Sequence, residues 1–115
     1  MKITDYAISQ ISKLVCSLQT GSEWIAFFNS FGARDVYDDL GLPDIGKQNG
    51  QRPSKKEYIA HRLKSINNTA NMRDAIARMA TFNDSILDSL NEILNPEHFS
   101  LTQQDGVWVV VGGVI

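Results

Sequence analysis

The sequence predicts a mostly α-helical protein, a small bundle of five or six short helices with a C-terminal β-hairpin. Two observations lead to this prediction. Apolar residues recur every three or four positions through most of the chain, as they do when one face of each helix is buried. At residues 99–102 and 107–111 the helical period is lost, and residues typical of β-strands flank Asp105-Gly106. The 115 residues suit a single domain with one core.

The first third of the chain predicts two helices. An apolar stripe predicts the first helix from about Thr4 to Leu18, with Thr4 as its N-cap. Gly21 then ends it, because glycine commonly follows the last turn of a helix. The second helix is expected to begin with Ser22 as its N-cap and to end at Gly32.

The second helix carries the densest aromatic block of the chain. Such a block can offer a stacking platform for nucleic-acid bases, but its helical spacing favours packing in the core. We therefore expect substantial burial of Trp24, Phe28 and Phe31. Residues 34–40 are expected to add one or two helical turns, with their inward positions at Val36, Tyr37 and Leu40.

Residues 41–53 have the composition of a loop, rich in Gly, Pro, Asn and Gln. Within them, the stretch GLPDIGKQ at residues 41–48 differs by one residue from the phosphate-binding pattern G-x-x-x-x-G-K-[ST]. A P-loop follows a buried strand and opens directly into a helix, whereas here an acidic, helix-like stretch comes first and no helix can begin before Pro53. Gln48 also lacks the hydroxyl group that would hold magnesium. We interpret the match as accidental.

Three more helices are expected after this loop. Ser54 and Glu57 form a capping-box pattern, S-x-x-E, which predicts a helix that the two asparagines at 67–68 end. A further helix is expected from about Thr69. The last should start at residue 83 or 84 and end before Pro96.

The charges are distributed unevenly. Residues 1–46 carry three basic and six acidic residues, residues 47–78 carry eight basic and two acidic residues, and residues 79–115 carry five acids and no Lys or Arg. This pattern fits either ordinary solvated helix faces or a basic surface that pairs with an acidic partner. In the second interpretation, the partner-binding residues are Lys47, Arg52, Ser54, Lys55, Lys56, Arg62 and Lys64.

Few residues fit an active site. His61 and His98 have no metal-ligand spacing, so each is expected to be a packed or surface imidazole. Cys16 is the only cysteine, and we expect it to be a half-buried, inert thiol. The sequence therefore predicts no catalytic residue, no cofactor and no metal site, and it favours a protein that is not an enzyme. A group of acidic residues consists of Asp35, Asp38 and Asp39. These residues either form a solvated face or bind a cation, although their spacing matches no calcium-binding loop.

The N-terminal residues lack the apolar run of a signal peptide. The longest apolar run, Val107 to Val111, is far too short to cross a membrane. Together with the single cysteine, these features predict a cytoplasmic protein without membrane contact.

The order of motifs in residues 22–67 resembles that of AbiJ N-terminal-like domains, small modules of bacterial abortive-infection proteins. The run FFNSFGARDVYDDLG is followed by a loop and then by RPSKKEYIAHRLKSIN, in which a Ser opens a basic helix. The loop at residues 41–53 departs from that pattern by its length. The matching residues are Phe27, Phe28, Phe31, Gly32, Asp35, Val36, Tyr37, Ser54, Lys55, Tyr58, Leu63 and Asn67.

The resemblance implies an adaptor or sensor module of an anti-phage defence protein, placed ahead of an effector such as a HEPN-type ribonuclease. The HEPN signature R-x4–6-H is absent from this chain, so the resemblance points to the non-catalytic half. It implies one helical interaction domain over residues 1–115, as the N-terminal part of a longer protein. The apolar C-terminal residues look like a domain boundary.

We therefore expect a module that mediates protein–protein association through the basic helix 54–67 and its flanking loop, with itself or with another protein. The alternative is a nucleic-acid-binding module that uses the basic segment 47–78. The sequence pI of about 5.6 counts against the alternative, because nucleic-acid-binding domains are usually strongly basic. An enzyme whose site needs another domain or chain also stays open.

Overall fold

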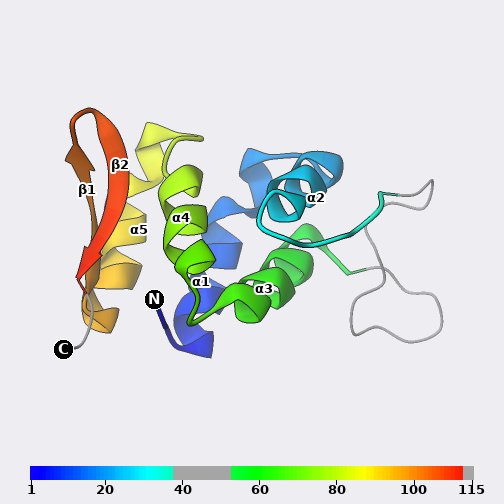
Figure 1. Ribbon diagram of the computed structural model, residues 1–115, viewed down its shortest axis with the longest axis horizontal. Coiled ribbons are helices and arrows are strands. Elements are labelled where there is room, and N and C mark those ends of the chain that lie inside the picture. Colours follow the sequence, from blue (N-terminus) through cyan, green and yellow to red (C-terminus); the bar gives the residue numbers. More distant parts are fainter. Residues whose placement is uncertain (38–52, 113–115) are drawn as a thin grey trace.

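The computed structural model describes residues 1–37 and 53–112 (Figure 1). These residues form five α-helices and one antiparallel β-hairpin, so the predicted fold class is confirmed. Short 3₁₀ turns follow or precede some of the helices, at Cys16–Leu18, Asp84–Ile86 and Asn95–Glu97. The elements are α1 (Asp5–Val15), α2 (Gly21–Asn29), α3 (Lys55–Ile66), α4 (Ala70–Met79), α5 (Leu87–Leu94), β1 (Phe99–Gln104) and β2 (Val107–Gly112).

Helix α2 begins two residues earlier than predicted. Its N-cap is Thr20, whose side chain accepts a hydrogen bond from the Glu23 N–H, while the Glu23 carboxylate accepts one from the Thr20 N–H. Ser22 is therefore not the cap. The reason is that Thr20 and Glu23 form a complete capping box, T-x-x-E, and this motif satisfies two backbone donors where a lone serine satisfies one.

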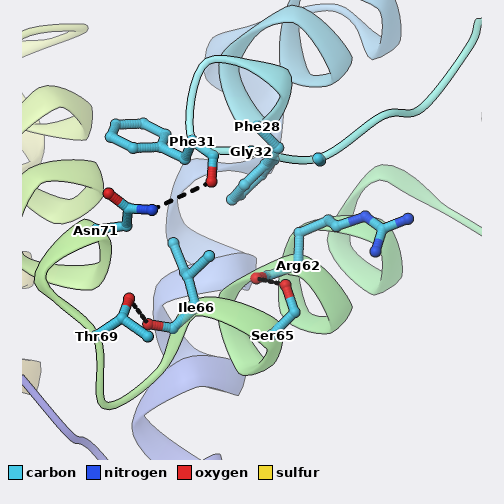
Figure 2. Close-up of a pocket in the computed structure, with 9 residues that line it drawn as sticks. Phe28, Phe31, Gly32, Arg62, Ser65, Ile66, Thr69 and Asn71 are labelled. Carbon is cyan, nitrogen blue, oxygen red and sulfur yellow. Dashed lines mark hydrogen bonds between the residues drawn. The ribbon is translucent and has the colours of Figure 1, made fainter.

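The sequence predicted burial of three aromatic residues, and two of them lie in the core. Trp24 and Phe28 are completely buried, and the Trp24 ring N–H donates to the Cys16 carbonyl at 3.2 Å. Phe31 is only half-buried, because it follows the last turn of α2 and lies at the rim of a pocket (Figure 2). There its carbonyl accepts a hydrogen bond from Asn71 at 3.2 Å.

The predicted turns after α2 are wrong for the residues that the structure describes. Residues 33–37 are not helical, and Val36 and Tyr37 are exposed rather than inward. The Asn29 side chain explains this conformation, since its amide nitrogen donates to the Asp35 carbonyl and its oxygen accepts from the Asp35 N–H. Both backbone groups of Asp35 thus have side-chain partners in place of helical ones. Leu40 and the P-loop-like stretch at 41–48 lie outside the described residues.

The prediction that Gly21 ends the first helix is wrong, because Gly21 is the first residue of α2, directly after the Thr20 cap. The helix boundaries after α2 agree closely with the sequence. Ser54 and Glu57 form the predicted capping box at the start of α3. Asn68 ends this region with a positive φ of 65°, a conformation that asparagine tolerates better than most residues. Asn83 caps the 3₁₀ turn that precedes α5, and α5 ends at Leu94, before the proline.

Strands β1 and β2 pair over six residues each and are joined by the two residues Asp105 and Gly106. Both joining residues have positive φ, 53° and 80°, as a type I′ turn requires. The face formed by Phe99, Leu101 and Val110 is buried against the helices.

The outer edges of the hairpin are partly covered by side chains of the neighbouring helices. In this register, alternate residues direct their backbone groups away from the partner strand. Arg73 of α4 donates to two such carbonyls of β2, those of Val110 (2.6 Å) and Gly112 (3.3 Å). Asn91 of α5 accepts a hydrogen bond from the Leu101 N–H on the edge of β1 at 2.7 Å. These contacts occupy part of each edge and so reduce the number of backbone groups that an additional strand could pair with.

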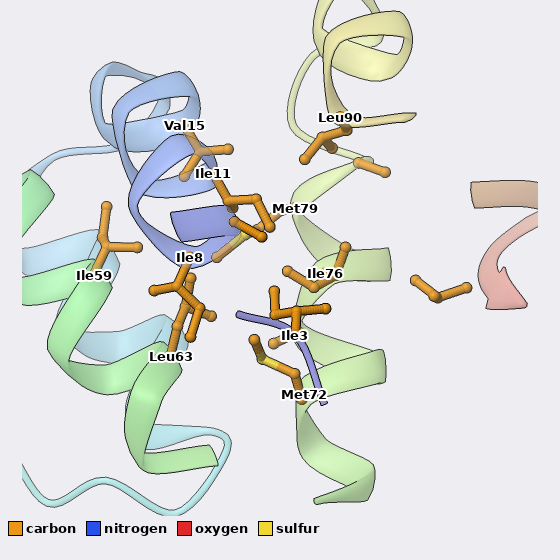
Figure 3. Close-up of a cluster of buried hydrophobic side chains, with 14 of the residues drawn as sticks. Ile3, Ile8, Ile11, Val15, Ile59, Leu63, Met72, Ile76, Met79 and Leu90 are labelled. Atoms are coloured by element: carbon orange, nitrogen blue, oxygen red, sulfur yellow. The ribbon is translucent and has the colours of Figure 1, made fainter. Parts of the chain in front are cut away.

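Helix α1 lies at the centre of the core and contacts both α3 and α5. Its apolar stripe, Ile8, Ile11 and Val15, is fully buried. Side chains from α3 and α4 converge on this stripe (Figure 3). Thr4 caps α1, and its own N–H donates to the Glu97 carboxylate at 2.7 Å, so the start of α1 is joined to the end of the α5 region.

Candidate interaction surface on helix α3

The sequence-predicted partner-binding residues separate into three groups. Lys47 and Arg52 lie outside the described residues. Ser54, Lys55 and Arg62 make contacts within the molecule. Lys56 and Lys64 are exposed on α3, as the interaction hypothesis requires.

The first contacts lie at the N-terminal end of α3. The Ser54 hydroxyl oxygen accepts from the Glu57 N–H at 3.2 Å and so completes the helix cap. The Lys55 ammonium donates to the Gln19 carbonyl at 3.1 Å, and the lysine side chain is half-buried. Lys55 therefore joins α3 to the connection between α1 and α2. Its ammonium group uses one of its hydrogen-bond donors in this contact.

Arg62 takes part in a polar cluster with Asp35 and Tyr58. Its guanidinium binds the Asp35 carboxylate through two hydrogen bonds, Nε to Oδ2 at 2.7 Å and Nη2 to Oδ1 at 2.5 Å. The Tyr58 hydroxyl donates to Asp35 Oδ2 at 2.6 Å. The Asp35 side chain is only 9% exposed, so this carboxylate is not part of a solvated acidic face. Arg62 is thus neutralised by Asp35, a carboxylate that the sequence analysis placed in a solvated or cation-binding acidic group.

This cluster fixes residues 33–37 to α3. Burial, followed by the hydrogen bond to Asp35, raises the pKa of the Tyr58 hydroxyl above its ordinary value. Tyr58 therefore stays protonated and donates to Asp35 across the physiological pH range. The contact joins residues on opposite sides of the segment 38–52, so no local pattern in the sequence could have indicated it.

Two arginines of the basic segment also make internal contacts. Arg73 holds the edge of β2 through the hydrogen bonds described above. Arg78 donates to the Ser30 hydroxyl at 2.8 Å, and its guanidinium lies 4.7 Å from the centre of the Phe31 ring. Both side chains act as links between α4 and neighbouring elements.

The exposed face of α3 carries Lys56, Glu57, His61, Lys64 and Ser65. The two lysines are eight residues apart, which corresponds to about 12 Å along a helix. Neither lysine forms an ion pair with another residue in the part of the chain that the structure describes. Burial, together with the positive charges of Arg62 and Lys64, lowers the pKa of His61, so the imidazole is neutral at pH 7. The positive charge of this face therefore comes from the two lysines.

A pocket of about 330 Å³ lies beside this face, between the end of α2 and the junction of α3 and α4 (Figure 2). Its apolar wall includes Phe28 and Phe31. Three polar side chains on its rim already donate to backbone carbonyls: Ser65 to Arg62, Thr69 to Ile66 and Asn71 to Phe31. These donors stabilise the ends of the helices.

Within residues 1–37 and 53–112, no three His, Cys, Asp or Glu side chains are grouped so that they could hold a metal ion. Cys16 is a half-buried free thiol, as expected. Among the described helices, none has the length and apolar character needed to cross a membrane.

Comparisons with protein-family models, curated proteins and solved structures found no match to this chain.

Proposed function

We propose that this chain is a non-catalytic protein-association module that binds an acidic protein surface through the exposed face of α3. The observation that carries the proposal is the pair Lys56 and Lys64, exposed two turns apart on a helix whose opposite side is buried in the core. A rigid helix presents such charges in a constant geometry, which favours recognition of a matching surface. The adaptor or sensor role in bacterial anti-phage defence, implied by the resemblance to AbiJ N-terminal-like domains, is part of this proposal.

The capped start of α3 and its polar cluster support this function. The capping box at Ser54 and the Asp35–Arg62 ion pair hold both halves of the helix in place. A preorganised surface loses little conformational entropy on binding. The helix backbone that carries the two lysines is therefore ordered before a partner binds.

The alternative, nucleic-acid binding through residues 47–78, has less support from the described residues. A nucleic-acid footprint needs a continuous positive face. Of the six basic residues described in this segment, four make contacts inside the molecule: Lys55, Arg62, Arg73 and Arg78. Two exposed lysines form only a small phosphate-binding surface.

Site-specific photo-crosslinking tests the proposal. A photoreactive amino acid replaces Ala60, which lies midway between the two lysines on α3, and the protein is irradiated in cells that express it. We expect a crosslinked protein adduct that is lost in the K56E/K64E variant. A photoreactive group at Asp105, in the hairpin turn, provides the control position.

Each result has a distinct meaning. An adduct that is digested by nuclease would favour the alternative, and fluorescence anisotropy with a labelled RNA oligonucleotide at two salt concentrations would then show a steep salt dependence. A protein adduct that persists unchanged in K56E/K64E would contradict the role of the lysines. The absence of any adduct specific to position 60 would contradict the proposed function as a whole.

A further inference from the structure

Helix α5 exposes an acidic face that complements the lysine face of α3. Asp88 and Glu92 lie one turn apart on α5, and Asp84 lies in the preceding 3₁₀ turn. All three are exposed. Among the residues that the structure describes, none of the three carboxylates has an ion-pair or hydrogen-bond partner.

A crevice beside this acidic face provides apolar surface. It has a volume of about 320 Å³ and lies between α1 and α5, where Glu92, Ile93, Pro96 and Tyr6 contribute to its lining. Tyr6 is 74% exposed, which is unusual for a large aromatic side chain of the central helix. A carboxylate next to an apolar wall suits a lysine, because the methylene groups pack on the wall while the ammonium reaches the carboxylate.

The two faces present their charges over comparable lengths. Lys56 and Lys64 are eight residues apart on α3, about 12 Å along that helix. Asp84, Asp88 and Glu92 extend over a 3₁₀ turn and the first two turns of α5. Helix α1 packs against both α3 and α5 and separates them (Figure 1). The lysine face therefore meets the acidic face of another molecule rather than its own.

We infer that the partner of the α3 lysine face is a second copy of this chain, which docks through Asp84, Asp88 and Glu92 of its α5. This inference rests on the proposed function, because it uses the same α3 face. The interface joins two different surfaces, so the dimer keeps one free face of each kind, one on each copy. Such a head-to-tail contact continues into open chains or closes into a ring.

The association depends on charge and is weak for each single contact. Exposed ion pairs contribute about 0–1 kcal/mol each and are screened by salt. Self-association therefore increases with protein concentration and decreases at high ionic strength. Contact of a lysine stem with the Tyr6 crevice adds a part that salt does not screen.

Sedimentation velocity of the full chain over a range of concentrations, at low and high ionic strength, tests this inference. The wild type is expected to form dimers and larger species at low ionic strength. The K56E/K64E and D88K/E92K variants are each expected to associate at least about tenfold more weakly. Their equimolar mixture should regain association into dimers and larger species, because the original pair of faces and the charge-reversed pair are then both complementary. The fourfold variant K56E/K64E/D88K/E92K should regain self-association.

Matched controls distinguish the effect of charge at these two faces from the effect of the change in net charge. K2E/R34E and D74K/D105K change exposed residues elsewhere by the same net charge and are expected to associate like the wild type. A wild type that stays monomeric at low ionic strength would overturn the inference, and so would a D88K/E92K variant that associates normally. If the Ala60 crosslink to another protein persists in a monomeric wild type, the proposed function stands and only the choice of partner is wrong.

Discussion

Asp35 has the largest role of any single polar residue described here. Its carboxylate accepts hydrogen bonds from Tyr58 and Arg62, and its backbone is held by Asn29. Because the Asp35 side chain is nearly buried, its removal leaves a half-buried guanidinium and a buried hydroxyl without their acceptor.

We expect Asp35→Ala to lower the free energy of unfolding by about 2 kcal/mol, because hydrogen bonds to charged groups in partly buried sites have this magnitude. Arg62→Ala should have a similar effect. In a double-mutant cycle, measured by urea denaturation, the two changes should couple by about 1 kcal/mol or more. Asp74→Ala, at an exposed position of α4, is the control and should change stability by less than about 0.5 kcal/mol. Additive effects of the two substitutions would show that the ion pair contributes little.

The depressed pKa of His61 predicts a pH dependence. Its folded-state pKa lies below the ordinary value of 6.5, so the fold favours the neutral imidazole. The stability due to this preference is complete above pH 6.5 and is lost as the pH falls below that value, where the unfolded chain binds the proton first. An NMR titration of the ring protons should give a midpoint below 6.5, and Lys64→Gln should raise that midpoint. A midpoint at or above the ordinary value would contradict the environment described for α3.

At the scale of the elements, the hairpin contains two glycines with positive φ, Gly106 (80°) and Gly112 (105°). A Cβ atom at Gly106 would meet nothing within 4 Å, whereas one at Gly112 would lie 2.3 Å from the His98 carbonyl oxygen. The first glycine is needed only for its backbone conformation. The second is also needed because the end of β2 passes close to the start of β1.

These two positions form a matched test. Gly106→Ala is expected to cost about 1 kcal/mol, the usual strain of a left-handed non-glycine residue. Gly112→Ala should cost at least about 1 kcal/mol more, because the backbone of residues 98–99 must move. Thermal unfolding followed by circular dichroism measures both. Equal costs would mean that the contact at Gly112 relaxes freely.

The sequence predicted most elements because their signals are local. The capping box at Ser54, the Asp105-Gly106 turn and the apolar stripe of α1 each lie within one element, and each was confirmed. The predicted turns at residues 34–40 were wrong for the described part, because Asn29 and the cluster on α3 override the local helical preference. The start of α2 was misplaced because the Thr20–Glu23 capping box lies just before the serine that was chosen.

At the scale of the whole molecule, one core depends on α1. Ile11 is fully buried where α1 meets its neighbours, so Ile11→Ala should cost about 3 kcal/mol. Tyr6→Ala on the same helix is the control and should leave the stability of the monomer nearly unchanged, since Tyr6 is 74% exposed. Urea unfolding should show one transition by circular dichroism and by the fluorescence of Trp24 and Trp108, which lie in different parts of the molecule. Separate transitions would mean that the hairpin unfolds independently.

The candidate site was harder to predict than the fold. Composition identified the basic segment, but it could not distinguish the lysines at 56 and 64 from basic residues that link elements. Lys55, Arg62, Arg73 and Arg78 find partners that are distant in sequence, and only the packing of the helices brings these partners near. Charge counts along a sequence therefore overestimate the charge that a surface offers to a partner.

The covered edges of the hairpin have a consequence for aggregation. Residues Val107 to Val111 combine high β-propensity with no charge and no proline, the composition of segments that stack into cross-β fibrils. Arg73 and Asn91 occupy backbone groups that would otherwise pair with a second chain. When α4 or α5 detaches, this protection is lost together with the helix. On heating, the protein should therefore aggregate irreversibly, mainly from partly unfolded states in which the hairpin edges are exposed before the chain can refold.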